Sequence, residues 1–160
     1  MRRLGLALLV GLLAAAPATA APPRAGVLDP GRSLGGVRLG DTAAQVLTRF
    51  GRFHGVCRGC GVRTWYFTYR PYDQQGVGVE LERGRVIAIF TLWSPPGWRT
   101  TGGLELGAPE QTLPTLRSVR CRGYRALLAR TPRALTAYYV VDGKLWGFGL
   151  QRPNVGICRD

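Results

Sequence analysis

One short pattern occurs twice in this chain, and the repeat constrains the fold more than any other feature. Residues 36–51 read GVRLGDTAAQVLTRFG and residues 103–118 read GLELGAPEQTLPTLRS, so both start with an apolar lead-in and a Leu-Gly turn. In the first copy the Asp41 carboxylate can accept hydrogen bonds from the free amides of a helical first turn, and the closing glycine suits a helix end. We therefore expect a helix over residues 42–50. The second copy predicts a weaker helix, because Pro114 lacks a backbone amide.

Three strand-like runs follow each copy of this pattern. They are aromatic and β-branched, alternate between apolar and polar residues, or are apolar throughout. The runs cover residues 63–69, 76–82, 85–92, 124–130, 135–141 and 145–151. Arg83-Gly84 and Asp142-Gly143 separate the last two runs of each set and predict tight hairpins, because glycine admits the positive φ that such turns need.

The order of these elements predicts an α+β fold class. We expect two tandem copies of a helix plus a three-stranded antiparallel sheet, which share one sheet and pack both helices on one face of it. One such unit alone would leave its edge strand unpaired. The predicted domain spans residues 34–152, with copy one at 34–94 and copy two at 102–152. A linker over residues 21–33 precedes it, and a C-terminal tail over residues 153–160 follows.

The first residues have the features of a secretory signal peptide. Arg2 and Arg3 precede an uncharged apolar run, and a small-residue cleavage site ends at Ala20. The apolar run over residues 4–16 is shorter than the roughly 20 residues of a membrane-spanning helix, which makes a membrane anchor the weaker alternative. Residues 1–20 are therefore predicted to be cleaved. The mature chain is predicted to be secreted or extracytoplasmic in the cell envelope, with no transmembrane segment.

The mature chain is strongly basic. Residues 1–20 hold two of the 22 basic residues and no acid, so the rest keeps 20 basic against 9 acidic residues, a net charge of +11. A surface of this kind attracts anionic wall polymers, acidic lipid head groups or nucleic acid, and an arginine bias of the coding sequence is the competing explanation. No specific nucleic acid is predicted as a partner. The candidate anion-binding residues are concentrated in the second half of the chain: Arg117, Arg120, Arg122, Arg125, Arg130 and Arg133.

Four cysteines in an exported chain point first to two disulfides. Three connectivities are open, and we favour Cys57 with Cys60 and Cys121 with Cys158. The alternative is a redox or metal site formed by His54, Cys57 and Cys60, which are spaced three residues apart. A redox Cys-x-x-Cys normally lies at a helix N-terminus, whereas the residues after Cys60 enter a predicted strand. Zinc would need a fourth ligand from elsewhere, so no metal and no cofactor is predicted.

The sequence contains no convincing catalytic set. Its three serines, Ser33, Ser94 and Ser118, lack a Gly-x-Ser-x-Gly setting, which argues against a serine hydrolase. Glu80 and Glu82 are the one acid/base candidate, because alternate residues on a strand face lie about 7 Å apart, in the range of glycosidase carboxylates. Their alternative role is the solvated side of an amphipathic strand. We therefore predict that the protein is not an enzyme.

The sheet face opposite the helices is predicted to be a concave binding surface. Alternation along the strands assigns to it Tyr66, Glu80, Glu82, Tyr138 and Trp146. Trp93 and Trp98 flank two prolines and are predicted to form an exposed aromatic pair, a feature typical of protein interfaces. The alternative is that one of these tryptophans packs beneath its own loop.

The lead-ins GVRLG and GLELG, each followed by a helix and an antiparallel sheet, resemble the β-lactamase-inhibitory-protein fold and its relatives in the BamE/SmpA outer-membrane assembly superfamily. The resemblance covers about residues 34–151. It implies an exported two-copy protein that presents the concave face of its sheet and its loops to an enzyme. The predicted function is an exported, disulfide-bonded, non-catalytic binding protein engaged in protein–protein interaction or inhibition, with an unidentified protein partner. Binding of an anionic envelope polymer or lipid through an arginine-rich face is the alternative, and thiol redox exchange is a weaker one.

Overall fold

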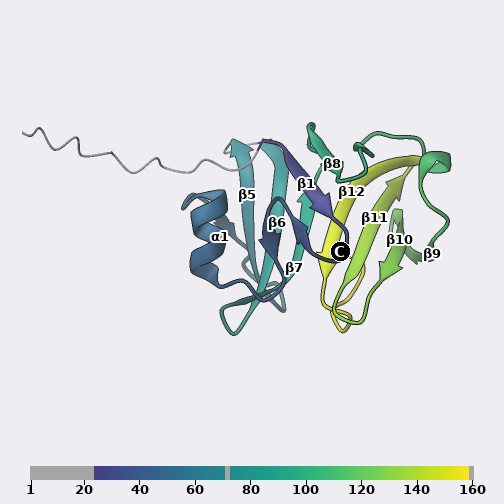
Figure 1. The fold of residues 1–160 in the computed structure, drawn as a ribbon. Helices are drawn as coiled ribbons and strands as arrows, with labels where there is room; N and C mark the ends of the chain where they lie inside the picture. The colour runs from purple at the N-terminus through teal and green to yellow at the C-terminus, as the bar shows by residue number, and fades with distance from the viewer. Residues whose placement is uncertain (1–23, 71–72, 159–160) are drawn as a thin grey trace, which may run out of the picture.

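The computed structural model describes residues 24–70 and 73–158 (Figure 1). In this part of the chain the fold is mostly β, with one α-helix and one short 3₁₀ turn. The helix α1 covers Ala43–Phe50, and the 3₁₀ turn η1 covers Glu110–Thr112. The strands are β1 (Gly26–Asp29), β2 (Ser33–Leu34), β3 (Val37–Arg38), β4 (Gly55–Val56), β5 (Arg63–Arg70), β6 (Asp73–Glu82), β7 (Arg85–Leu92), β8 (Trp98–Thr100), β9 (Arg117–Cys121), β10 (Tyr124–Arg130), β11 (Leu135–Val141) and β12 (Lys144–Gln151).

Eight of these strands form one antiparallel sheet in the order β4-β5-β6-β7-β12-β11-β10-β9. The meander β5–β7 and the meander β10–β12 meet side by side at its centre, where Gly149 of β12 pairs with Phe90 of β7. The six predicted strands and both predicted hairpins are therefore confirmed. The central residues of the two turns, Arg83-Gly84 and Asp142-Gly143, all have positive φ, between 47° and 73°, as a two-residue type I′ turn requires.

A second, four-stranded sheet has the order β3-β2-β1-β8 and is mixed, because β1 pairs antiparallel with β2 and parallel with β8. Together with α1 it covers one face of the large sheet (Figure 1). Leu28 and Phe50 from this covering layer pack with Val79, Ile89 and Phe148 of the large sheet in the main core. Full burial of such a side chain contributes about 1.5–3 kcal/mol, so the covering layer is held mainly by apolar contact.

The helix α1 forms where the sequence predicts it, but its N-cap is Thr42 rather than Asp41. The Thr42 amide donates to Oε1 of Gln45 (2.7 Å), and the Gln45 amide donates to Oγ1 of Thr42 (3.2 Å), so the two residues satisfy each other's free groups. The Asp41 carboxylate accepts instead from the amide of Arg38 (2.9 Å). Gly51 ends the helix with a φ of 89°, a conformation that glycine adopts without strain.

The predicted second helix is absent, so the predicted α+β fold of two helix-plus-sheet copies is wrong. Residues 110–112 make a single 3₁₀ turn, and the chain is extended again at Leu113. Pro109 and Pro114 bracket this turn, and each lacks the amide that would continue a helical ladder. Leu116 packs against the main core from the segment that follows. Both three-stranded meanders are present, but only the first is preceded by a helix, so the chain is not a tandem repeat of helix-plus-sheet units.

The segment predicted as a linker, residues 21–33, contains β1 and the first residue of β2. Leu28 is fully buried, and Gly26 lies so close to Trp98 that an added Cβ would be 2.6 Å from its ring. The folded part therefore begins at β1, earlier than predicted. The predicted signal peptide, residues 1–20, lies outside the described residues. In the described part, no helix has the length and apolar character needed to cross a membrane.

Candidate binding cleft

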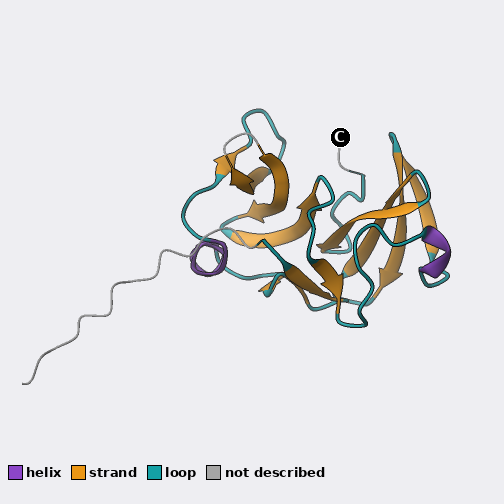
Figure 2. Cartoon of the chain, turned by 90° about the horizontal axis from the view of Figure 1, so that it is seen from above, coloured by secondary structure: helices purple, strands orange, loops and turns teal. Residues whose placement is uncertain are grey.

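The uncovered face of the large sheet is curved and holds a cleft of about 690 Å³. Strand twist accumulates over eight strands and brings the two ends of the sheet round to the same side. Figure 2 shows both ends rising on that side, with the C-terminal segment between them. Gly61 and Val62, before β5, and Arg122 and Gly123, before β10, line the cleft from opposite ends of the sheet. Residues that are far apart in the strand order thus share one cavity.

Two aromatic rings form the floor of the cleft because glycines leave room for them. An added Cβ on Gly78 would lie 2.4 Å from the ring of Phe90, and one on Gly149 would lie 2.4 Å from the hydroxyl of Tyr139. A residue with a side chain does not fit under either ring without displacing it. The other apolar members of this floor cluster are Tyr66, Leu92, Tyr124, Ala126, Leu128, Ala137, Trp146 and Ile157.

Trp93 lies at the rim of the cleft and is 56% exposed. Its ring meets that of Trp146 edge to face, with 6.0 Å between the ring centroids. Trp93 and Ser94 both have positive φ, of 54° and 47°, which is costly for residues other than glycine. The side-chain amide of Gln75 donates to the carbonyl oxygens of both residues, at 3.3 and 3.5 Å. A strained backbone conformation at Trp93 and Ser94 thus positions the large indole ring at the entrance of the cleft.

The two disulfides join Cys57 to Cys60 and Cys121 to Cys158, which confirms the favoured pairings. Cys60 and Cys158 line the cleft from opposite sides, so each side carries one disulfide. The Cys57 amide donates to the carbonyl of Thr64 (2.9 Å) and ties the small disulfide ring to β5. Disulfides form and persist in oxidising compartments, so the predicted extracytoplasmic location is confirmed.

Glu80 is 9% exposed and is the one carboxylate among the described residues that line the cleft. Glu82, the other carboxylate of the predicted pair, is not among the residues that line the cleft. Glu82 lies beside the hairpin, where its Oε2 is 4.0 Å from Nη1 of Arg152. The two carboxylates therefore lie in different surroundings.

The residues of the predicted binding face lie in different parts of the structure. The cleft lining includes four of them: Tyr66, Glu80, Trp93 and Trp146. Tyr138 belongs instead to the main core, where its ring centroid is 6.1 Å from that of Phe148 and burial raises the pKa of its hydroxyl above 10.0. Tyr139 takes the predicted place of Tyr138. Strand β11 is apolar on both faces, so alternation does not show which of the two tyrosines faces the cleft. The sequence feature that could have shown it is Gly147, the small cross-strand partner of Tyr139 on β12.

Trp98 is fully buried, so the predicted exposed pair of Trp93 and Trp98 is wrong. The Trp98 indole N–H donates to the hydroxyl of Tyr69 (2.9 Å), and the ring packs over Gly26. The partner of Trp93 is Trp146, which comes from a strand about fifty residues later in the chain. The predicted pair was chosen because Trp93 and Trp98 are close in sequence, whereas the aromatic contact is made between strands.

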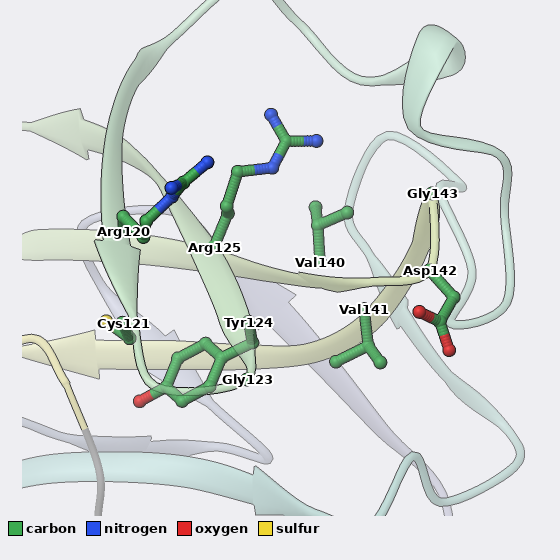
Figure 3. Close-up of a pocket in the computed structure, with 9 residues that line it drawn as sticks. All are labelled: Arg120, Cys121, Gly123, Tyr124, Arg125, Val140, Val141, Asp142 and Gly143. Atoms are coloured by element: carbon green, nitrogen blue, oxygen red, sulfur yellow. The ribbon is translucent and has the colours of Figure 1, made fainter.

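The six candidate anion-binding arginines are all exposed but do not form one face. Arg120 of β9 and Arg125 of β10 are direct cross-strand partners and point to the same side, away from Tyr124 (Figure 3). They border a separate, open depression of about 360 Å³. The Arg125 guanidinium forms an ion pair with Glu110.

The remaining arginines are distributed differently. Arg122 lines the cleft, and Arg133 lies in the exposed turn before β11. Arg117 pairs with Leu128 of the floor cluster, and alternation along β10 puts Arg130 on the same face of the sheet, but neither arginine lines the cleft. The predicted single arginine-rich face is therefore wrong, because a period of two along each strand divides its members between the two faces.

His54 packs against the main core and is not part of the cleft lining. Its ring centroid is 4.3 Å from that of Trp65 and 5.3 Å from that of Phe67. Cys57 and Cys60, the other members of the predicted alternative metal or redox site, are bonded to each other. In residues 24–70 and 73–158, no group of three or more His, Cys, Asp or Glu side chains is arranged to hold a metal ion.

No family model matches this chain, and no curated protein does either. Among solved structures, the chain is similar to an extracellular protein containing an SCP domain from Bacillus anthracis str. Ames, with a TM-score of 0.47 and 13% sequence identity. The similarity covers 72% of this chain and 44% of that protein, so the chain spans less than half its length. The predicted resemblance to the β-lactamase-inhibitory-protein fold and the BamE/SmpA superfamily is wrong, because the second helix that it requires is replaced by a single 3₁₀ turn over residues 110–112.

Proposed function

We propose that this chain is an exported, disulfide-bonded binding protein without catalytic activity, and that its concave cleft receives a segment of a partner protein. The observation that carries the proposal is the cleft itself, which measures about 690 Å³ and is lined mainly by aromatic and aliphatic side chains. A disulfide-anchored segment borders it on each side. The centres of protein interfaces are enriched in Trp, Tyr and Arg, and the cleft combines all three.

Trp93 and Trp146 are the anchors that we assign to this interaction. In the free protein, the positive φ of Trp93 costs free energy, and its exposed ring gains little from burial. A partner that covers the ring offsets this cost. Because the backbone and the contact with Trp146 already fix the ring, binding also costs little side-chain entropy.

The absence of catalytic activity is supported by where the ionisable side chains lie. Glu80 lines the cleft, whereas Glu82 lies outside the lining with its Oε2 4.0 Å from Nη1 of Arg152. A glycosidase of the usual kind needs two carboxylates at its site, so this arrangement supports a binding role over glycoside hydrolysis. His54 stacks on Trp65, outside the cleft. Turnover of a glycan, ester or peptide substrate that is lost in the Glu80→Gln variant would contradict the proposal.

Affinity capture from the envelope and medium of the producing cell tests the binding role. The baits are the mature wild-type chain, Trp93→Ala and Phe53→Ala, a control because Phe53 is 79% exposed and lies outside the cleft lining. We expect one partner protein that wild type and Phe53→Ala retain and that Trp93→Ala retains about tenfold less, as for an interface hot spot. Equal retention by all three baits would exclude the cleft as the binding site.

Charge-driven binding of an anionic envelope polymer has less support. Arg120 and Arg125 project from the opposite side of the β9–β10 hairpin to Arg117 and Arg130, so no continuous arginine-rich face is available to a polymer. The same capture experiment at low and high salt separates the two functions. Retention through charge alone disappears at high salt, whereas an apolar interface largely persists.

A further inference from the structure

We propose that the β4 end of the large sheet docks on a lipid bilayer with anionic head groups, through the exposed side chains of Phe53 and Val56 and the arginines around them. Neither residue lines the cleft, so this inference goes beyond the binding function proposed above. It comes from two apolar side chains that are left in solvent, from the rigid support beneath them and from the charge that surrounds them.

Phe53 and Val56 are large apolar side chains that lie three positions apart and are both exposed. Phe53 exposes 79% of its surface, the highest value among the large hydrophobic side chains of the described residues, and Val56 exposes 53%. Burial of such side chains in an apolar phase is favourable in proportion to the area removed from water. A single exposed hydrophobic side chain is ordinary on a protein surface, whereas a pair with basic neighbours is a feature of interaction sites.

The backbone that carries this pair is fixed to β5. Val56 is the cross-strand partner of Trp65. The ring centroid of His54, the residue after Phe53, is 4.3 Å from that of Trp65. The disulfide between Cys57 and Cys60 closes the chain directly after β4. Because the segment is held in place before binding, little conformational entropy is lost when a surface covers it.

Val56 projects to the face of the sheet opposite the cleft. Val56 and Trp65 are direct partners and therefore share a face, and Trp65 packs in the main core. The neighbouring pair, Gly55 and Tyr66, belongs to the other face, where Tyr66 lines the cleft. A surface that docks on Val56 thus does not use the cleft lining.

Arginines surround the apolar pair. Arg52, Arg58 and Arg63 are all exposed, and residues 42–72 contain no Asp or Glu. In the described part of the chain, none of these three arginines forms an ion pair. The guanidinium carbon of Arg63 is 5.1 Å from the ring centroid of Trp65, so one positive charge lies beside the strand pair that carries the exposed valine.

The carboxylates of β6, the strand beyond β5, do not neutralise this charge. Arg63 pairs with Leu81 of the main core and projects to that face, whereas Glu80 lines the cleft on the other face. Oε2 of Glu82 is 4.0 Å from Nη1 of Arg152. The β4 end of the sheet therefore combines positive charge with exposed apolar side chains.

This combination fits an anionic bilayer better than a soluble anionic polymer. Guanidinium groups bind lipid phosphates, and each basic residue near an anionic membrane surface strengthens binding by about fivefold. The boundary between head groups and acyl chains also receives aromatic and aliphatic side chains. A soluble polymer offers no such apolar layer, so it gives Phe53 no reason to matter.

Flotation of the mature, disulfide-bonded chain with lipid vesicles tests this inference. One set of vesicles contains phosphatidylcholine alone, and the other contains phosphatidylcholine and phosphatidylglycerol in equal parts. We expect the wild-type chain to float with the second set only. Phe53→Ala should bind the anionic vesicles about tenfold more weakly, and Val56→Ser and Arg58→Gln about fivefold more weakly.

Two control variants carry matched changes elsewhere on the surface. Val27→Ser alters an exposed valine of β1, and Arg120→Gln removes an exposed arginine of β9, at the opposite end of the large sheet. Both should bind the anionic vesicles as wild type does. Circular dichroism and urea denaturation of every variant show that a loss of binding is not a loss of fold.

Three results would overturn the inference. The first is a wild-type chain that floats with neither set of vesicles, or equally with both. The second is equal affinity of Phe53→Ala and wild type for the anionic vesicles, which would indicate attraction by charge alone, as for an anionic polymer. The third is a loss in Arg120→Gln equal to that in Arg58→Gln, which would make the net charge of the chain, rather than the β4 end, the cause of binding.

Discussion

Tyr139 lies over two glycines of the neighbouring strand, Gly147 and Gly149. A Cβ at position 149 would meet the tyrosine hydroxyl at 2.4 Å, closer than real Cβ atoms come, so a larger residue must push the ring outward. Phe90 depends on Gly78 in the same way. At the scale of single residues, the depth of the cleft is therefore determined by positions that lack a side chain.

Gly149→Ala should lower the free energy of unfolding by about 1–3 kcal/mol, the usual cost of overpacking. Tyr139→Phe in the same chain should recover part of this loss, because the closest contact is the hydroxyl oxygen. Urea denaturation of the single and double variants measures the coupling. Gly156→Ala is the control, since its Cβ meets nothing within 4 Å, and it should change stability by less than about 0.5 kcal/mol. Strictly additive losses in the double variant would contradict this account of the floor.

Tyr138 gives a second prediction at this scale. Burial raises the pKa of its hydroxyl above 10.0, so the folded state disfavours tyrosinate. The associated stability is fully present below about pH 10 and is lost as the pH rises through the folded-state pKa. Thermal unfolding between about pH 9 and pH 11 should show a smaller loss for Tyr138→Phe than for wild type. An equally steep loss would place the tyrosine hydroxyl in solvent rather than in the core.

At the scale of elements, the disulfides hold the loops on both sides of the cleft. Cys57 and Cys60 close a small ring beside β5, whereas Cys121 and Cys158 are 37 positions apart and tie the C-terminal segment to β9. In the chain-entropy model, the larger loop stabilises the fold by about 4 kcal/mol and the smaller one by about 2 kcal/mol. The two disulfides thus contribute unequally to stability.

Removal of each disulfide by paired Cys→Ser substitution should reproduce this difference. The Cys121→Ser/Cys158→Ser variant should lose about twice as much free energy of unfolding as Cys57→Ser/Cys60→Ser. Denaturant titration of both variants and wild type under non-reducing conditions provides the comparison. A larger loss in the Cys57/Cys60 variant would mean that the small ring has a role beyond loop closure.

Local sequence signals account for the elements that were predicted correctly. The helix α1 has its own capping residues, and each long hairpin has its own turn residues. The strands β1 to β3 were not predicted because each has only two to four residues, and because β1 pairs with β8 from a distant part of the chain. The second helix was predicted from its similarity to α1, but two flanking prolines limit it to one 3₁₀ turn.

At the scale of the whole molecule, the cleft results from the pairing of β7 with β12 and from the twist of eight strands. Alternation along the strands was sufficient to predict that Tyr66, Glu80 and Trp146 share a face. It was not sufficient for Arg122 and Cys158, because these residues reach the cleft from a turn and a tail whose positions depend on the complete sheet. The candidate site was therefore predictable at its centre and not at its edges.

We propose above that a partner protein binds in the concave cleft. Two exposed valines offer a matched test of this proposal. Val62, directly before β5, lines the cleft, whereas Val56, in β4, does not. A photo-crosslinking amino acid placed at either position in the producing cell, followed by mass spectrometry of the adducts, reports which surface a partner touches. We expect an adduct with one partner protein from position 62, none from position 56, and loss of the adduct when Trp93→Ala is added. Equal adducts from both positions, or an adduct that Trp93→Ala leaves unchanged, would contradict it.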